Sequence, residues 1–254
     1  MPDRSGFDAG TYGRSFADVY DEWYPGDEAT DAAVAALSDL AGPGGRILEL
    51  GVGTGRLALP LAAAGHPVTG MDASEEMLER LRGKLRGGDA TVEVVHGDVG
   101  DPHQWPAGPF DVVVAAFNLV FNLPSEQDQA RCFDAAAGVL APGGTLVVEA
   151  FVPAPLPERD RRLEVREVTA SRVVLIATDA DPSTGVVVGQ HVELVDGEPV
   201  RLRPWRLRVA PPADLDRLAA AAGLELAARH ADWKGAPFDP HGATHVSRYR
   251  RPGG

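Results

Sequence analysis

Cysteine is almost absent, since Cys132 is the single cysteine among 254 residues. A lone cysteine excludes an intramolecular disulfide framework and favours a reducing compartment. Long apolar runs are missing too, because the least polar stretch, 112–124, is too short to span a bilayer and contains two asparagines. The first residues lack the apolar segment of a signal peptide. We therefore expect a soluble, cytoplasmic protein with no membrane partner.

Basic side chains are also few compared with acidic ones. Lysine and arginine total 24 against 37 aspartates and glutamates, a formal net charge of −13. Nucleic-acid binding relies on basic side chains, so this balance argues against a nucleic-acid partner. The basic clusters at 201–208 and 248–251 alternate as strands with one solvated face do. His230, His241 and His245 lack the spacing of a metal site, and we expect no metal.

Short apolar segments alternate with helical ones through the middle of the chain. The predicted strands are 46–50, 67–71, 91–97, 110–117 and 144–151, and the predicted helices are 56–65, 74–85 and 125–140. Strands separated by helices form parallel crossover units. A further helix at 212–223 and two closing strands complete the pattern. It predicts an α/β fold, doubly wound around a mostly parallel seven-stranded sheet.

The pattern differs on both sides of this region. Residues 1–10 are expected to be disordered, and two helical stretches fill 15–41, interrupted by a Pro-Gly turn. Strands with no helix between them follow the core, which predicts an inserted antiparallel β meander. We expect four parts: N-terminal helices (1–45), an α/β core (46–151), the insertion (161–209), and a last helix with the closing strands (210–254).

A glycine-rich stretch, LELGVGTGR, follows the first predicted strand and carries Gly51, Gly53 and Gly55. A dinucleotide-binding loop needs G-x-G-x-x-G, whose third glycine lets the helix pack against the strand. Arg56 occupies that third position. The departure disfavours an NAD-dependent oxidoreductase, which stays as an alternative.

Acidic residues mark the ends of three successive predicted strands: Glu49, Asp72 and Asp98. The carboxyl ends of parallel strands form the rim at which open α/β sheets bind ligands. Asp72 is placed to accept hydrogen bonds from ribose hydroxyls, and Asp98 from an adenine amino group. The register of all three acids predicts a ligand site at this rim.

Five stretches in order, LELGVGTGR, VTGMDASEEML, VVHGDVGD, FDVVVAAFNLVFNL and LAPGGTLVVEAF, resemble the motifs of class I S-adenosylmethionine-dependent methyltransferases. The flanks are similar to small-molecule members, closest to N,N-dimethyltransferases that act on amino sugars of macrolide antibiotics. The resemblance implies a Rossmann-like fold, S-adenosylmethionine as cofactor, and methyl transfer to nitrogen or oxygen of a small molecule in secondary metabolism. It also implies a homodimer formed through the insertion.

The same resemblance implies a role for each motif residue. The three glycines let the backbone approach the methionine part of the cofactor, and Glu49 orients the loop and the amino group. The N-terminal helices act as a lid. The remaining implied cofactor contacts are Tyr20 and Tyr24 on the lid, Asp72, Ala73, Met77, Asp98 and Val99 around the ribose and adenine, and Asn118 at the methionine end.

Candidate catalytic residues are fewer, because methyl transfer requires chiefly alignment of the nucleophile and exclusion of water. The resemblance places Tyr24 and Asn122 at the substrate. His191, in the insertion, is a candidate general base or substrate ligand, and a histidine on a strand face is the plainer alternative. Glu149 ends the fifth strand on the same rim. Trp205, Trp233 and Phe238 either wall an apolar pocket or pack in the core.

Two other functions compete with this prediction. A nucleic-acid methyltransferase acting on base amines carries an N/D-P-P-Y/F-type motif after the fourth strand, where this chain has FNLVFN. A catalytically silent protein that binds the cofactor and acts through its meander as an interaction module would keep all of the motifs.

Overall fold

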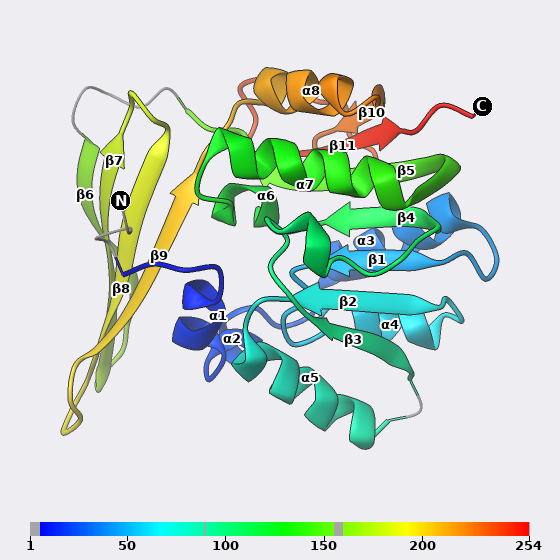
Figure 1. Ribbon diagram of the computed structural model, residues 1–254. Helices are drawn as coiled ribbons and strands as arrows, with labels where there is room; N and C mark the ends of the chain where they lie inside the picture. The colour runs from blue at the N-terminus through cyan, green and yellow to red at the C-terminus, as the bar shows by residue number, and fades with distance from the viewer. Residues whose placement is uncertain (1–5, 89, 155–159, 254) are drawn as a thin grey trace.

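The computed structural model describes residues 6–88, 90–154 and 160–253. Its main sheet has seven strands in the order β10-β11-β5-β4-β1-β2-β3 (Figure 1). β1 to β5 pair in parallel, whereas β10 and β11 join β5 antiparallel. The strands are β1 (Ile47–Leu50), β2 (Val68–Asp72), β3 (Val92–His96), β4 (Phe110–Ala115), β5 (Leu140–Phe151), β10 (Glu225–His230) and β11 (Thr244–Arg250). The predicted doubly wound, mostly parallel sheet is confirmed.

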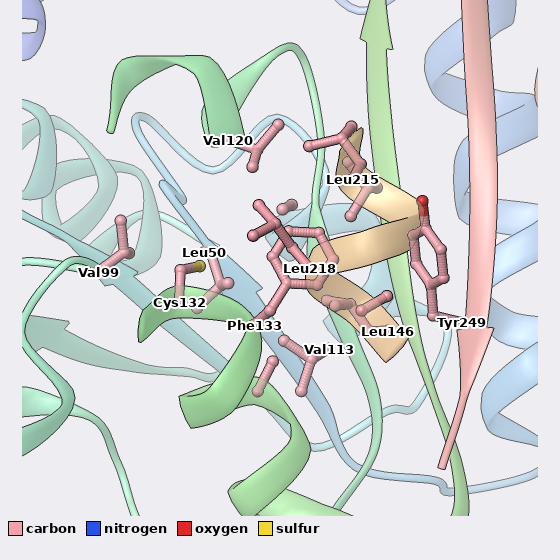
Figure 2. Close-up of a cluster of buried hydrophobic side chains, with 14 of the residues drawn as sticks. Leu50, Val99, Val113, Val120, Cys132, Phe133, Leu146, Leu215, Leu218 and Tyr249 are labelled. Atoms are coloured by element: carbon pink, nitrogen blue, oxygen red, sulfur yellow. The ribbon is translucent and has the colours of Figure 1, made fainter. Parts of the chain in front are cut away.

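Helices cover both faces of this sheet, and successive strand residues pack to opposite sides. Val113 joins the cluster with α7 and α8 that Figure 2 shows, while Val112 and Val114 join the cluster with α3, α4 and α5. Side chains of Asp27, Ser74 and Ser125 cap the first turns of three of these helices. The five helices are α3 (Glu28–Ala41), α4 (Ala58–Ala63), α5 (Glu75–Arg86), α7 (Glu126–Val139) and α8 (Pro212–Ala221). Among the described residues, every helix is too short or too polar to cross a membrane.

A separate four-stranded antiparallel sheet stands beside the main sheet (left in Figure 1). It consists of β6 (Asp160–Val168), β7 (Arg172–Asp181), β8 (Val186–Val195) and β9 (Arg201–Arg208), each paired with the next along the chain. The predicted meander is therefore confirmed. One row of paired residues crosses this sheet on the face turned away from the lid helices. The row consists of Val165, Leu175, Val192 and Leu202, of which Val165 and Leu202 are strongly exposed.

The N-terminal segment lies between the two sheets as α1 (Thr11–Phe16) and α2 (Tyr20–Trp23). The prediction of disorder for 1–10 is wrong for 6–10, and residues 1–5 lie outside the described residues. The carboxylate of Asp8 accepts hydrogen bonds from the Gly10 amide and the Thr11 hydroxyl, both at 3.0 Å. These contacts form the turn that starts α1 four residues before the predicted helix.

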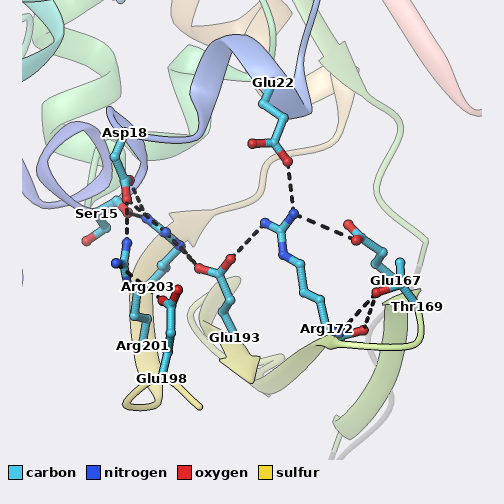
Figure 3. Close-up of polar contacts among 10 residues, drawn as sticks. All are labelled: Ser15, Asp18, Glu22, Glu167, Thr169, Arg172, Glu193, Glu198, Arg201 and Arg203. Carbon is cyan, nitrogen blue, oxygen red and sulfur yellow. Dashed lines mark hydrogen bonds and ion pairs between the residues drawn. The ribbon is translucent and has the colours of Figure 1, made fainter. Parts of the chain in front are cut away.

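Buried charges join this lid to the small sheet (Figure 3). Arg203, 4% exposed, contacts the carboxylates of Asp18 (3.0 Å) and Glu193 (2.8 Å). Arg172 extends the chain of contacts from Glu193 (2.7 Å) to Glu22 (2.9 Å) on α2. We call these five residues the lid–sheet network. The prediction that 201–208 presents its basic residues on a solvated face is wrong for Arg203, because the lid packs on that face.

Candidate functional site

A cavity of about 800 Å³ opens at the carboxyl ends of β1, β2, β3 and β4. The lid helices and β9 close its other sides. Eleven of the predicted site residues line it: Tyr20, Tyr24, Gly51, Gly53, Asp72, Ala73, Met77, Asp98, Val99, Asn118 and Asn122. His191 lines it as well. The structure therefore brings together residues that the sequence places up to 171 positions apart.

The glycine loop owes its shape to left-handed backbone conformations. Gly51 and Gly53 have φ of +64° and +55°, which side-chain-bearing residues rarely adopt. A Cβ on Gly53 would meet only the Gly51 carbonyl oxygen, at 3.9 Å, so its open side faces the cavity. Gly55 differs, because it is outside the cavity lining and a Cβ there would lie 2.5 Å from Leu81. Gly55 thus packs against α5, and its backbone contact with a ligand stays a prediction.

Asp72 holds this loop from the end of β2. Its two carboxylate oxygens accept hydrogen bonds from the Gly53 amide (2.9 Å) and the Ser74 amide (2.8 Å). Burial raises the pKa of the carboxyl group, although these backbone donors oppose the shift. Each carboxylate oxygen has a second lone pair. Asp72 can therefore fix the loop and still accept hydrogen bonds from a ligand in the cavity.

Glu49 is a buried side chain with an unused hydrogen-bond acceptor. It is 4% exposed, and its Oε2 has no hydrogen-bond partner among the described residues. Burial raises the pKa of Glu49 to about 8, despite the nearby guanidinium of Arg56. An unpaired buried acceptor is costly. A cationic or N–H-donating ligand group next to Glu49 would remove that cost.

An aromatic wall closes the cavity on the lid side. The rings of Tyr20 and Tyr24 are 5.1 Å apart, and Tyr24 meets Phe117 edge-on at 5.1 Å. Tyr12 also lines the cavity. Sequence reasoning missed Tyr12 and Phe117, since neither belongs to a periodic pattern. Burial raises the pKa of Tyr20 to about 12, so its hydroxyl stays protonated at neutral pH.

The turn after β4 supports the opposite wall. Phe117 and Asn118 both have left-handed φ, +53° and +65°. Asn118 Oδ1 accepts a hydrogen bond from the Phe151 amide at 2.7 Å. Glu149 accepts from the Phe117 amide (2.8 Å) and the Trp233 indole (2.7 Å), and it is outside the cavity lining. Glu149 is therefore a support for this strained turn, and the polar role in the cleft considered for it is not found.

His191 approaches the cavity from β8. The Trp205 indole N–H donates to His191 Nδ1 at 3.0 Å. Burial, with the charges of Arg166 and Arg203, lowers the pKa of His191 to about 4. The ring is therefore neutral at pH 7, with its proton on Nε2, and acts as a hydrogen-bond donor. Because the Trp205 indole occupies Nδ1, this environment disfavours the predicted role of general base, which stays a prediction.

Of the three predicted aromatic residues, one lines the cavity and two pack elsewhere. Trp205 lines the cavity, whereas Trp233 and Phe238 do not. Trp233 packs in the core, and Phe238 lies 6.4 Å from the ring of His245. Within the described ranges, no cluster of histidine, cysteine and acidic side chains could hold a metal ion.

Comparisons with known proteins match this geometry. A family model described as a methyltransferase domain matches residues 47–144. The chain is 30% identical over 201 residues to the dTDP-3-amino-3,4,6-trideoxy-α-D-glucopyranose N,N-dimethyltransferase of Streptomyces venezuelae, covering 70% of this chain and 82% of that one. The solved CcbJ methyltransferase of Streptomyces caelestis shares 38% identity, with a TM-score of 0.90 over 97% of this chain and 100% of that one. The chain belongs to the S-adenosylmethionine-dependent methyltransferases.

Another relative of this methyltransferase matches over a shorter range. The demethylmenaquinone methyltransferase of Clavibacter sepedonicus is 37% identical over 155 residues, or 60% of this chain, and the match spans only 58% of that relative.

The cavity fits S-adenosylmethionine, the cofactor of this family. Glu49 lies outside the cavity lining, close to Gly51 in the sequence, and its unpartnered Oε2 suits an ammonium group; the open side of Gly53 allows close backbone approach. Asp72 has acceptor capacity left for two ribose hydroxyls. The cofactor supplies a methyl group already bonded to a sulfonium leaving group, so the protein needs no strong electrophile of its own.

Proposed function

We propose that this methyltransferase transfers a methyl group to an amine nitrogen of a small molecule in secondary metabolism. The observation that carries the proposal is the hydrogen bond from the Trp205 indole to His191 Nδ1 at the cavity, which occupies the nitrogen that a base would use. An amine can react as its free base without a dedicated proton acceptor, whereas a hydroxyl needs one. The aminosugar dimethyltransferase of S. venezuelae, similar over 82% of its length, supports the same class of acceptor.

The cofactor half of the cavity is assigned residue by residue under this proposal. Glu49 and the loop of Gly51 and Gly53 hold the methionine part, and Asp72 holds the ribose. Ala73, Met77, Asp98 and Val99 enclose the adenine, with Asn118 near the methionine end. Tyr20 and Tyr24, on the lid side of the cavity, exclude water. Residues 46–151 thus bind the cofactor, 1–45 close over it, 161–209 cover the acceptor, and 210–254 complete the sheet.

In this proposal, the residues around the methyl acceptor position its nucleophilic nitrogen and transfer no proton. Asn122 and Tyr24 offer hydrogen-bonding groups beside the methionine end. His191 offers an N–H donor held by Trp205. Alignment of the nitrogen lone pair with the methyl group then provides most of the rate enhancement.

Binding and turnover together test this proposal. Calorimetry should show binding of S-adenosylhomocysteine and none of NAD, because Arg56 replaces the third glycine of the dinucleotide loop. Incubation with S-adenosylmethionine and a nucleotide-linked amino sugar should release S-adenosylhomocysteine, and the matched hydroxyl sugar should not. Cofactor binding without turnover on any amine of a sugar panel would favour the catalytically silent alternative. Binding of NAD but not S-adenosylhomocysteine would exclude methyl transfer.

We expect His191→Ala to lower kcat/KM only a few fold. Removing a general base costs about 10²–10⁴-fold, but a ring with a pKa near 4 and an occupied Nδ1 cannot act as one at pH 7. His191→Gln, which keeps an N–H donor, should retain more activity than alanine. The shape of the pH profile between pH 6 and pH 9 should stay that of wild type. Loss of the acidic limb of that profile in His191→Ala, with cofactor affinity intact, would show that His191 is the base.

We propose further that two copies pair through the outer face of the small sheet. Leu163, Val165, Val168 and Leu202 are 59–68% exposed there, an apolar area unusual for a solvated strand face. Light scattering at micromolar concentration should give the mass of a dimer. Val165→Lys should shift the mass toward the monomer, and Val200→Lys, in the turn before β9, should not. A monomeric wild type would contradict the pairing.

A further inference from the structure

A second cavity, of about 1020 Å³, lies on the outer side of the lid. α1, α5 and β9 wall it, and it shares no lining residue with the cofactor cavity within the described ranges. Six of its lining residues are arginines: Arg14, Arg80, Arg82, Arg86, Arg201 and Arg203. We call this cavity the arginine groove.

The charge of the arginine groove opposes that of the whole chain. Three acids, Asp18, Glu76 and Glu79, line it beside the six arginines, whereas the chain carries a net charge of −13. Arg203 is committed to the lid–sheet network. Arg80 and Arg86 differ, because neither forms an ion pair with a carboxylate in the part of the chain that the structure describes. Both lie on α5 and are available to an anion.

Arginine in this arrangement suits phosphate. The guanidinium group presents parallel N–H donors that match a phosphate in a bidentate manner, and it is always charged. The Arg14 side chain comes from the other wall and contacts the exposed carboxylate of Asp8 and, at 3.3 Å, the Thr11 hydroxyl, so an anion would compete with these two partners for it. The volume is that of a pocket for a small molecule. Glu79, on the same helix, can accept from a hydroxyl group of such a ligand.

The groove also shares its walls with the cofactor cavity. On α1, Tyr12 and Gly13 line the cofactor cavity, and Arg14 and Ser15 line the groove. On α5 the corresponding residues are Met77 and Arg80. A ligand that bridges Arg14 to Arg80 would therefore hold α1 against α5, and α1 covers the cofactor. Coupling between two such sites is reciprocal.

We propose that the arginine groove binds a phosphate-bearing small molecule, and that its occupancy strengthens cofactor binding by fixing α1 over the cavity. This site goes beyond the proposed methyl transfer and does not depend on the identity of the acceptor.

Inorganic pyrophosphate, titrated by calorimetry in metal-free buffer at constant ionic strength, tests the proposal. Wild type should bind it, and the double variant Arg80→Gln/Arg86→Gln should bind about tenfold more weakly, the loss expected for one charge-assisted contact. The control Arg161→Gln/Arg250→Gln removes the same charge from exposed positions elsewhere and should behave as wild type. Pyrophosphate should also raise the affinity for S-adenosylhomocysteine in wild type and control, but not in the groove variant.

Three outcomes would overturn the inference. Equal pyrophosphate affinity in the groove variant and the control would show that the anion binds elsewhere. Displacement of S-adenosylhomocysteine by pyrophosphate would place it in the cofactor cavity. An unchanged cofactor affinity with the groove occupied would refute the coupling. These are binding readouts, so they remain informative even if no tested amine is methylated, and thermal melts confirm that each variant is folded.

Discussion

Asp72→Ala is expected to weaken the binding of S-adenosylhomocysteine by about 1.5–3 kcal/mol, the usual value of hydrogen bonds to a charged group. The carboxylate has two functions that the substitution removes together. It accepts from the Gly53 amide, which fixes the glycine loop, and it is the acceptor assigned to the ribose hydroxyls. Calorimetry on wild type and variant measures the difference directly.

Asp72→Asn separates these two functions. The amide keeps one oxygen for a backbone donor but loses the charge and the second acceptor, so its cofactor affinity should fall between those of wild type and alanine. The melting temperature of Asp72→Asn should remain near that of wild type. If Asp72→Ala binds S-adenosylhomocysteine as wild type does, the residue is only a turn-forming group and the assignment to the ribose is wrong.

Arg203→Met is expected to destabilise the folded protein by about 3 kcal/mol, within the range measured when one partner of a buried ion pair is removed. Glu193, 6% exposed, would lose two of its hydrogen bonds. Arg172 would still contact it, which keeps the cost at the lower end. Urea denaturation gives the free energy of unfolding. Arg201→Met on the same strand is the control, and a change within about 0.5 kcal/mol is expected because its side chain is largely exposed.

The pH dependence of this effect follows from the carboxylates. Burial raises the pKa of Glu193, but the guanidinium groups of Arg203 and Arg172 outweigh burial, so the pKa of Glu193 is lowered. A hydrogen bond from Arg203 lowers the pKa of Asp18. Groups with a lowered folded-state pKa stabilise the fold above their unfolded pKa and lose that contribution as the pH falls through the folded value. The difference between wild type and Arg203→Met should therefore be full at pH 7 and shrink below about pH 4. An undiminished difference in acid would mean that the network contributes packing and not charge.

The parallel core was predictable because each of its signals is local. An apolar strand, a glycine turn and a helix follow one another within a few residues, and the acids at the strand ends meet at one rim by geometry alone. Gly51 and Gly53 have the positive φ that such a turn requires. Asp72 lines the cavity from the end of β2, where the Gly53 and Ser74 amides hold its carboxylate.

The lid and the small sheet were less predictable because their contacts are distant in sequence. The alternation at 201–208 indicates a strand, but Arg203 is buried by Asp18, 185 positions away. Glu149 was correctly placed at the rim, yet its carboxylate binds the Trp233 indole, 84 positions away, and turns from the cavity. For His191 the sequence could not show that a tryptophan indole occupies the nitrogen that a base would use.

The lid–sheet network has a consequence for recombination among relatives. Asp18 and Glu22 come from the first helices, whereas Arg172, Glu193 and Arg203 come from the insertion, so any crossover between these segments separates charges that neutralise one another. A chimera that receives only a foreign insertion leaves Asp18 and Glu22 without these arginines at the seam. A chimera that receives only a foreign lid leaves Arg172 and Arg203 to share the carboxylate of Glu193. Engineers who wish to change the acceptor by domain exchange should therefore move residues 11–23 together with 160–208, as a single discontinuous module.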